Sequence, residues 1–122
     1  MAEDTEALTL VGDVKGHDVI IVDDEVDTGG SITSAARVAQ EHGARDIYLC
    51  FAHAVFSPPA VERLQACPVK EIVTTNSIPI PPEKRMANLA VLSVAGLLGE
   101  VIRRVHEGCS VGEMFRGYQR FK

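Results

Sequence analysis

One stretch decides the fold: Val19-Ile20-Ile21-Val22-Asp23-Asp24-Glu25-Val26-Asp27-Thr28-Gly29-Gly30-Ser31. Its apolar, mostly β-branched beginning predicts a buried strand over residues 19–22 of a parallel sheet. An acidic pair and a turn of small residues follow, and a helical pattern begins at Ile32. This order is typical of a strand that ends in a ligand loop at the N-terminus of a helix.

The glycines of this loop favour a bound anion. Gly29 and Gly30 allow a tight bend and let a ligand approach the backbone closely. The amides from Asp27 to Ser31 would then open toward one point at the positive end of the helix, a geometry that binds phosphate. The hydroxyl groups of Thr28 and Ser31 can add donors.

The acidic pair needs a different partner, because carboxylates repel phosphate. Asp23 and Asp24 suit the vicinal hydroxyls of a polyol, which would donate to them, or a divalent cation. Groups that donate hydrogen bonds to a phosphate thus lie beside carboxylates that accept them from a diol. This combination indicates a phosphorylated sugar, and we expect a pentose phosphate first. The alternative is a plain strand–turn–helix junction with solvated acids and a capping Ser or Thr.

The rest of the chain alternates between strand and helix. We expect an amphipathic helix over 32–42, capped by Gly43, and a buried strand over 47–52, which together with the first strand form a right-handed βαβ unit. A short helix to about Gln65, strands at 71–75 and 89–93, and a helix at 94–107 follow. The fold class is therefore α/β, a three-layer open, mostly parallel sheet with flanking helices.

Composition narrows the class of protein. The chain has 122 residues, of which 46% are hydrophobic and 24% charged, as expected for one domain. The net charge of −5 argues against a nucleic-acid surface, and no apolar run is long enough to span a membrane. Three cysteines without metal-ligand spacing suit a reducing compartment, so we expect a cytoplasmic protein without nucleic-acid or membrane partners.

Three further motifs flank the loop. They are Gly12-Asp13-Val14-Lys15-Gly16, Ala52-His53-Ala54-Val55-Phe56-Ser57, and Val91-Leu92-Ser93-Val94-Ala95 before a helix that ends Ile102-Arg103-Arg104-Val105-His106-Glu107-Gly108. Together with the loop, this ordered set resembles ribose-phosphate pyrophosphokinase, a branch of the type I phosphoribosyltransferase-like superfamily. The resemblance runs from about residue 10 to residue 115.

The resemblance implies a domain assignment and an activity. Residues 1–122 would be a single domain, equivalent to most of the C-terminal phosphoribosyl-binding domain, incomplete at its N-terminal side and without the family's N-terminal domain. The complete enzyme would transfer a diphosphoryl group from ATP to ribose 5-phosphate, giving phosphoribosyl pyrophosphate and AMP. The residues implied to bind the sugar phosphate are Asp23, Asp24, Asp27, Thr28, Gly29, Gly30 and Ser31.

The resemblance also implies a cofactor and catalytic groups that lie outside the matched region. Mg²⁺ is the implied cofactor, and its main ligands, the residues that grip ATP and the catalytic Lys and Arg lie upstream of the matched region in the family. We identify no catalytic residue here and expect the chain alone to be inactive, although Asp23 and Asp24 could contribute to a metal site. A homo-oligomer is implied as well.

Two other functions stay open. One is a phosphoribosyltransferase that uses phosphoribosyl pyrophosphate, although no segment suggests a hood over an acceptor. The other is a non-catalytic, synthase-like partner or assembly protein. His53, at the ligand edge of the sheet, matches a histidine of the family and is either structural or catalytic. Lys84 and Arg85 are interpreted as a solvated loop pair rather than a phosphate clamp.

Overall fold

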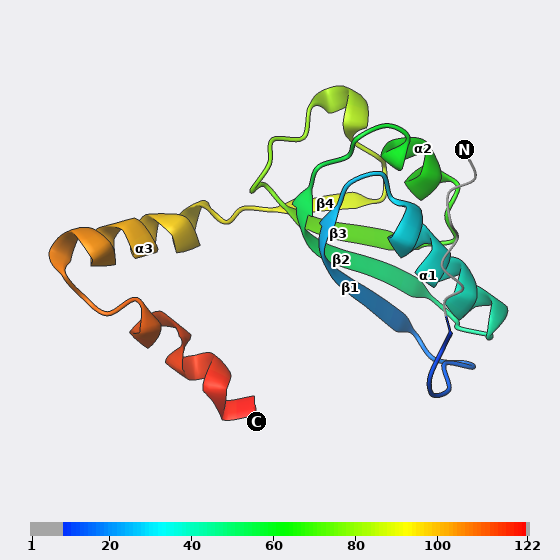
Figure 1. Ribbon diagram of the computed structural model, residues 1–122, viewed down its shortest axis with the longest axis horizontal. Coiled ribbons are helices and arrows are strands. Elements are labelled where there is room, and N and C mark those ends of the chain that lie inside the picture. The colour runs from blue at the N-terminus through cyan, green and yellow to red at the C-terminus, as the bar shows by residue number, and fades with distance from the viewer. Residues whose placement is uncertain (1–8, 122) are drawn as a thin grey trace. The chain divides into compact units, whose positions relative to one another are not determined.

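A four-stranded parallel sheet, in the order β1-β2-β3-β4, occupies the first three quarters of the chain (Figure 1). The structure is a computed structural model that describes residues 9–121, with side chains to residue 116. It divides into two units, one that runs to Leu92 and one that begins at Ser93. The elements of the first unit are β1 (Val19–Val26), α1 (Gly30–Glu41), β2 (Ile47–Ala54), α2 (Ala60–Gln65), β3 (Glu71–Thr75), the 3₁₀ helix η1 (Pro82–Lys84) and β4 (Leu89–Leu92).

All neighbouring strands are parallel, and their apolar residues are in register. Ile21 lies opposite Leu49, Leu49 opposite Ile72, and Ile72 opposite Leu89. Helix α1 joins β1 to β2 and α2 joins β2 to β3, as in successive βαβ units. The predicted α/β fold, a parallel sheet with flanking helices, is confirmed.

The core lies between one face of the sheet and the two helices. Alternate residues of β2 point into it, and Ile47, Leu49 and Phe51 are all buried. Helix α1 contributes Ile32, Thr33, Ala36 and Ala39, and helix α2 contributes Ala60 and Leu64. Because alanine side chains are short, Ala36 and Ala39 let α1 approach the sheet closely.

The opposite face of the sheet carries apolar side chains that stay exposed. Ile20 and Val22 alternate with the inward residues of β1, and they are 67% and 73% exposed. The described helices of this unit therefore cover one face. They supply one helical layer of the three-layer arrangement expected from the sequence.

Strand β1 is longer than predicted. The sequence placed its end at Val22, because acidic residues are poor strand formers. In the structure the strand continues to Val26, with Asp23 opposite Phe51 and Glu25 opposite His53. Pairing with β2 thus overrides local propensity, and the acidic pair belongs to the strand rather than to the loop.

An ion pair holds the beginning of β1 against the beginning of β2. The Asp18 carboxylate accepts hydrogen bonds from Arg45 Nε at 2.7 Å and Nη2 at 2.6 Å, and from the Asp46 amide at 3.2 Å. The Arg45 guanidinium lowers the pKa of Asp18 to about 2. Asp18 therefore stays ionised, and the pair stays formed, until the pH falls well below 4.

The second unit consists of α3 (Ala95–Glu107) and the 3₁₀ segment η2 (Gly112–Phe121). The predicted helix over 94–107 is confirmed, and Gly108 ends it with φ at 71°. The spacing of its apolar residues, among them Leu97, Leu98 and Val101, predicts a buried face, but the structure leaves no residue of α3 buried. No helix in residues 9–121 is long and apolar enough to cross a membrane.

The core contains one polar side chain that offers a stability test. Thr74 is 1% exposed, and its hydroxyl group meets no partner within the described part of the chain. A buried hydroxyl without a partner costs free energy that a methyl group of the same shape does not. We predict that Thr74→Val raises the free energy of unfolding by about 1 kcal/mol, measured by urea denaturation.

Thr33→Val is the matched control, with the opposite sign expected. Thr33 is also buried, but its hydroxyl donates to the carbonyl of Gly29 at 2.7 Å. Its loss should lower the free energy of unfolding by about 1 kcal/mol. Equal effects of the two substitutions would contradict this assignment of the two hydroxyl groups.

Candidate functional site

The loop singled out from the sequence lies at the carboxyl end of β1 and leads into α1. Gly29 is the N-cap of α1, with φ at 81° and ψ at 4°. No side chain caps this end of the helix, and its first turn contains no acidic residue. The first amides of α1, at the positive end of the helix, are therefore left for a ligand.

Two carbonyl groups of the loop are bound on the protein side. The Thr28 carbonyl accepts a hydrogen bond from Arg63 Nη1 at 3.2 Å. The Gly29 carbonyl accepts from Thr33, at 3.2 Å from the amide and 2.7 Å from the hydroxyl group. In a trans peptide unit the N–H points opposite to the C=O. The amides of Gly29 and Gly30 therefore point away from these donors.

The carbonyl that ends β1 is bound in the same way. Val26 O accepts from the amides of Val55 and Phe56, at 3.1 Å each, in the connection after β2. The N–H of the same peptide unit belongs to Asp27, and it too points away from the scaffold. The polar groups of the loop are thus sorted, with carbonyls toward the protein and amides away from it.

A glycine at position 29 is required by the backbone. Gly29 is buried, and its φ lies in the left-handed region that other residues rarely adopt. A β-carbon built there would lie 3.5 Å from the Ala60 Cα, which is ordinary contact. Backbone conformation, rather than space, therefore selects glycine here.

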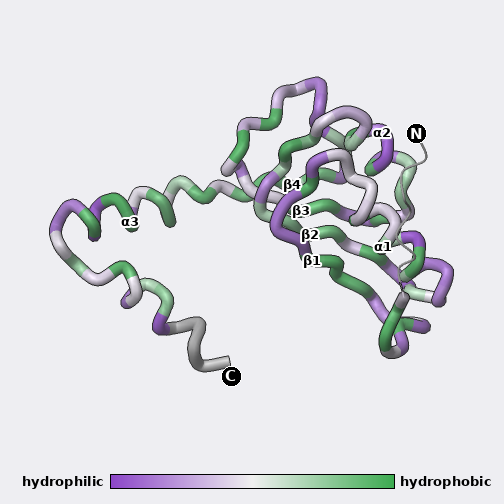
Figure 2. The backbone as a smooth tube through the Cα atoms, in the orientation of Figure 1, coloured by the Kyte–Doolittle hydropathy of each residue, from purple (hydrophilic) through white to green (hydrophobic). Residues whose placement is uncertain are grey.

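The predicted loop donors differ in exposure. Ser31, in the first turn of α1, and Asp27 are exposed, whereas Thr28 and Gly30 are half-buried. Ser31 thus offers an exposed hydroxyl group in the first turn of α1. Figure 2 shows β1 changing from hydrophobic to hydrophilic as it approaches this loop.

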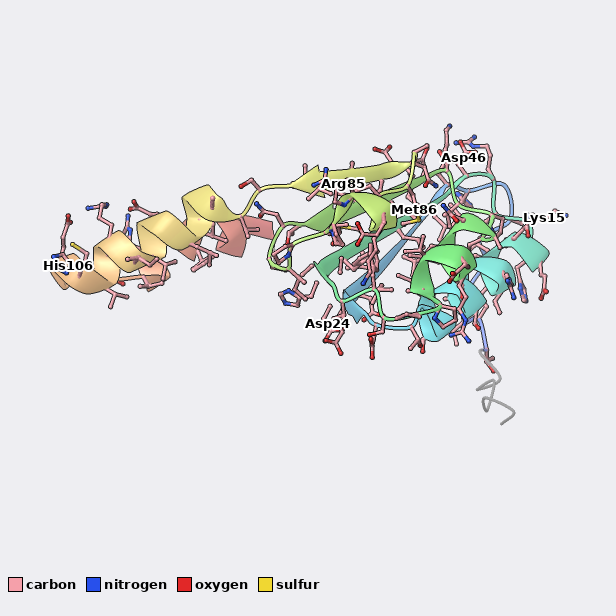
Figure 3. All side chains as sticks on the ribbon, turned by 90° about the horizontal axis from the view of Figure 1, so that it is seen from above. Lys15, Asp24, Asp46, Arg85, Met86 and His106 are labelled. Atoms are coloured by element: carbon pink, nitrogen blue, oxygen red, sulfur yellow. The ribbon has the colours of Figure 1, made fainter. Side chains whose placement is uncertain are left out.

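The acidic pair lies on the last part of β1, before the loop (Figure 3, where Asp24 is labelled). Asp23 Oδ1 accepts the Asp24 amide, and Asp24 Oδ1 accepts the Glu25 amide, each at 2.8 Å. Hydrogen bonding with the Asp23 side chain and from the Glu25 amide lowers the pKa of Asp24 below its usual value. Asp24 is therefore an anionic acceptor at neutral pH.

The donor set does not complete a metal site. Within residues 9–116, no three His, Cys, Asp or Glu side chains are arranged to hold a metal ion. Asp23 and Asp24 are successive strand residues and supply two carboxylates between them. Since Mg²⁺ demands a near-octahedral shell of oxygen ligands, these carboxylates could supply only part of it.

His53 lies next to the acidic segment, opposite Glu25 in the register of β1 and β2. Its Nδ1 is 2.8 Å from Ser77 Oγ, and Ser77 Oγ donates to the Ala52 carbonyl at 3.1 Å. Ser77 belongs to the connection after β3, so two strand ends meet here. Electrostatic attraction to His53 also lowers the pKa of Asp24.

The sequence interpretation missed the supporting residues. Arg63 and Ala60 on α2 contact the loop, and nothing in the local pattern of that short helix indicates this role. Lys84 was wrongly expected to be solvated, since its Nζ donates to the Phe56 carbonyl at 2.9 Å. These contacts join segments far apart in sequence, where periodicity carries no signal.

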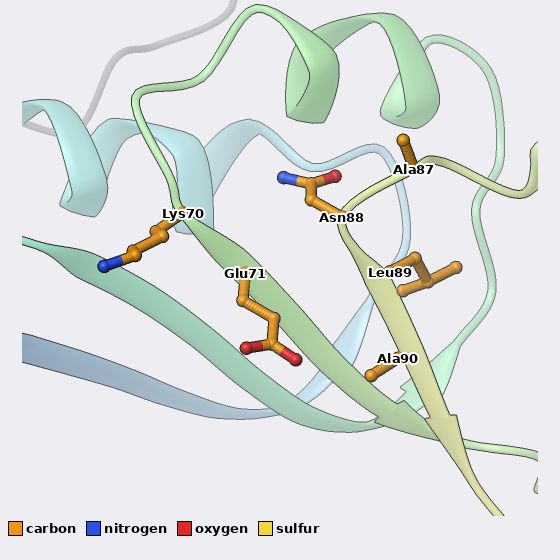
Figure 4. Close-up of a pocket in the computed structure, with 6 residues that line it drawn as sticks. All are labelled: Lys70, Glu71, Ala87, Asn88, Leu89 and Ala90. Carbon is orange, nitrogen blue, oxygen red and sulfur yellow. The ribbon is translucent and has the colours of Figure 1, made fainter.

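A surface hollow lies elsewhere on the sheet (Figure 4). Its lining comes from the beginnings of β3 and β4 and consists of Lys70, Glu71, Ala87, Asn88, Leu89 and Ala90. Because the strands are parallel, these residues lie at the edge opposite the loop that follows β1. The hollow is therefore separate from the candidate site.

Comparisons with known proteins agree with the geometry. The sequence pattern of the phosphoribosyl synthetase-associated domain matches residues 1–116. A ribose-phosphate pyrophosphokinase from Nostoc sp. is 54% identical over 111 residues, and ribose-phosphate pyrophosphokinase 1 from Spinacia oleracea is 49% identical, also over 111 residues. Each match covers 91% of this chain, and 34% and 33% of the respective relatives. The resemblance seen in the sequence is confirmed.

A solved structure is similar as well. The crystal structure of phosphoribosylpyrophosphate synthetase from Mycobacterium smegmatis superimposes with a TM-score of 0.79 and 46% sequence identity. The match covers 80% of this chain and 33% of that chain. This chain thus spans about a third of the length of the relatives that it matches.

Gly29→Ala tests the loop geometry. Holding alanine in the left-handed region costs about 1 to 2 kcal/mol, so the loop should relax and turn its amides. We predict a lower melting temperature and loss of ribose 5-phosphate binding, measured by calorimetry.

Gly12→Ala is the matched control, because Gly12 also has a positive φ, 100°, with nothing within 4 Å of a built β-carbon. It should lower stability without changing binding. Unchanged binding in Gly29→Ala would contradict the predicted role of the loop.

Proposed function

Because the chain belongs to the phosphoribosyl synthetase-associated domain family, we propose that it binds ribose 5-phosphate and phosphoribosyl pyrophosphate as part of a ribose-phosphate diphosphokinase. The complete enzyme would use ATP as the diphosphoryl donor and release AMP. We propose that residues 1–122 form one domain, equivalent to most of its C-terminal phosphoribosyl-binding domain.

The observation that carries the proposal is the loop after β1, whose carbonyls face the protein and whose amides face away from it. Amides near the N-terminus of α1 would bind the 5-phosphate, together with the hydroxyls of Thr28 and Ser31. Asp24, and with it Asp23, would accept hydrogen bonds from the ribose 2- and 3-hydroxyls. The loop amides and the carboxylates would then bind opposite ends of one ligand, which keeps the carboxylates away from the like charge of the phosphate.

Binding of this kind positions the sugar for transfer. The carboxylates would bind the diol next to the reacting 1-hydroxyl, and the loop would bind the 5-phosphate at the other end of the sugar. The 1-hydroxyl would thereby be held in one position. Positioning and neutralisation of charge dominate phosphoryl-type transfer. This chain would supply the positioning, whereas groups outside it would supply the charge.

We propose Mg²⁺ as cofactor of the complete enzyme, with its main ligands outside this chain. A cytoplasmic homo-oligomer without nucleic-acid or membrane partners suits the net charge of −5 and the thiols of Cys50, Cys67 and Cys109, none of which is in a disulfide.

Asp24→Asn tests the proposed function. The amide keeps the shape of the side chain but loses the anionic acceptor, so affinity for ribose 5-phosphate should fall about tenfold or more. Isothermal titration calorimetry on the 122-residue chain measures this. Asp13→Asn is the matched control, since Asp13 is exposed at the other end of β1 and should leave affinity unchanged. A wild-type chain that binds no ribose 5-phosphate refutes the proposal.

A second candidate is a non-catalytic, synthase-associated role. The description of the matching family as an associated domain favours it. Such a chain would bind the sugar phosphate or a synthase subunit without turnover.

Activity assays separate the two. We expect no AMP from ATP and ribose 5-phosphate with this chain alone, because no catalytic residue is identified in it. Expression together with the coding sequence upstream of Met1 should give AMP if the chain is part of an enzyme. AMP formation by the chain alone would contradict the assignment of the catalytic groups to other segments.

A further inference from the structure

We propose that Arg63 is a positioning residue of the phosphate loop, which aims the Gly29 amide at the ligand and adds positive charge beside Gly30. This inference rests on the proposed binding of a sugar phosphate by that loop. Arg63 belongs to α2, which is separated from the loop by α1 and β2 in sequence. Its role is therefore visible only in the folded chain.

Arg63 fixes the direction of the peptide unit between Thr28 and Gly29. Arg63 Nη1 donates to the Thr28 carbonyl at 3.2 Å. That carbonyl and the Gly29 N–H belong to the same peptide unit and point in opposite directions. With the carbonyl bound to Arg63, the N–H must face away from α2, toward the open side of the loop. Without Arg63, this peptide unit is free to rotate through the flexible backbone of Gly29.

Arg63 also places a positive charge beside the loop. A β-carbon built on Gly30 would lie 3.3 Å from Arg63 Nη1, so the guanidinium lies directly beside the backbone of the loop. A half-buried cation at this distance is screened less than an exposed one. It strengthens the attraction that the positive end of α1 already exerts on an anion.

Helix α2 holds Arg63 in place, as a residue that positions another group requires. Ala60 and Leu64, which flank Arg63 on α2, are 0% and 1% exposed. Ala60 also packs against Gly29, and Cys67, just after α2, lies with its Sγ 3.9 Å from the Thr33 carbonyl. Helix α2 is thus anchored to the loop and to α1 on both sides of Arg63.

Arg63→Met is the decisive variant, because methionine keeps an apolar stem and removes both the donors and the charge. We expect its affinity for ribose 5-phosphate to fall about tenfold, the usual effect of losing one charge-assisted hydrogen bond. Arg63→Lys restores charge and a donor and should recover most of the affinity. Arg37→Met makes the same change at an exposed position of α1 and should leave affinity within about twofold.

Calorimetric titration of the 122-residue chain with ribose 5-phosphate, and with inorganic phosphate, gives these affinities, and thermal melting shows that each variant is folded. If Arg63→Met is unfolded during the titration, Arg63→Leu, which also lacks donors and charge, replaces it with the same expected loss. Wild-type affinity in the folded variant overturns this inference alone. Equal losses in Arg63→Met and Arg63→Lys also overturn it, because they indicate packing rather than charge and donation. A wild-type chain that binds neither ligand overturns the proposed function, and this inference with it.

Discussion

A trans peptide unit points its carbonyl and its N–H in opposite directions, and the loop after β1 depends on this constraint. Its carbonyls at Val26, Thr28 and Gly29 are bound by donors of the scaffold. The corresponding amides are thereby directed outward by contacts within the protein. A loop organised in this way loses little conformational entropy when it binds, which is the physical meaning of preorganisation.

The donors that organise the loop come from segments that the sheet brings together. The connection after β2 binds Val26 O, and α2 binds Thr28 O. Lys84, from η1, in turn binds the Phe56 carbonyl and so supports that connection. Parallel strands place all these connections at one edge of the sheet, which is why the order of the strands matters to the site.

Much of this arrangement could be predicted from the sequence. The apolar runs and glycines indicated all four strands and the main helices, because periodicity and capping are local signals. The end of β1 could not be predicted, since pairing with β2 carries Asp23 and Glu25 into the strand. The roles of Arg63 and Lys84 could not be predicted either, because each contacts a backbone carbonyl more than twenty-five residues away.

We propose above all that the amides from Asp27 to Ser31 bind the phosphate of the ligand. Titration of the ¹⁵N-labelled chain with ribose 5-phosphate, followed by amide chemical shifts, tests it most directly. The account predicts that the largest shifts fall on these amides, with smaller ones around Asp24. Saturable shifts confined to other residues, such as those lining the hollow at the beginnings of β3 and β4, would contradict it.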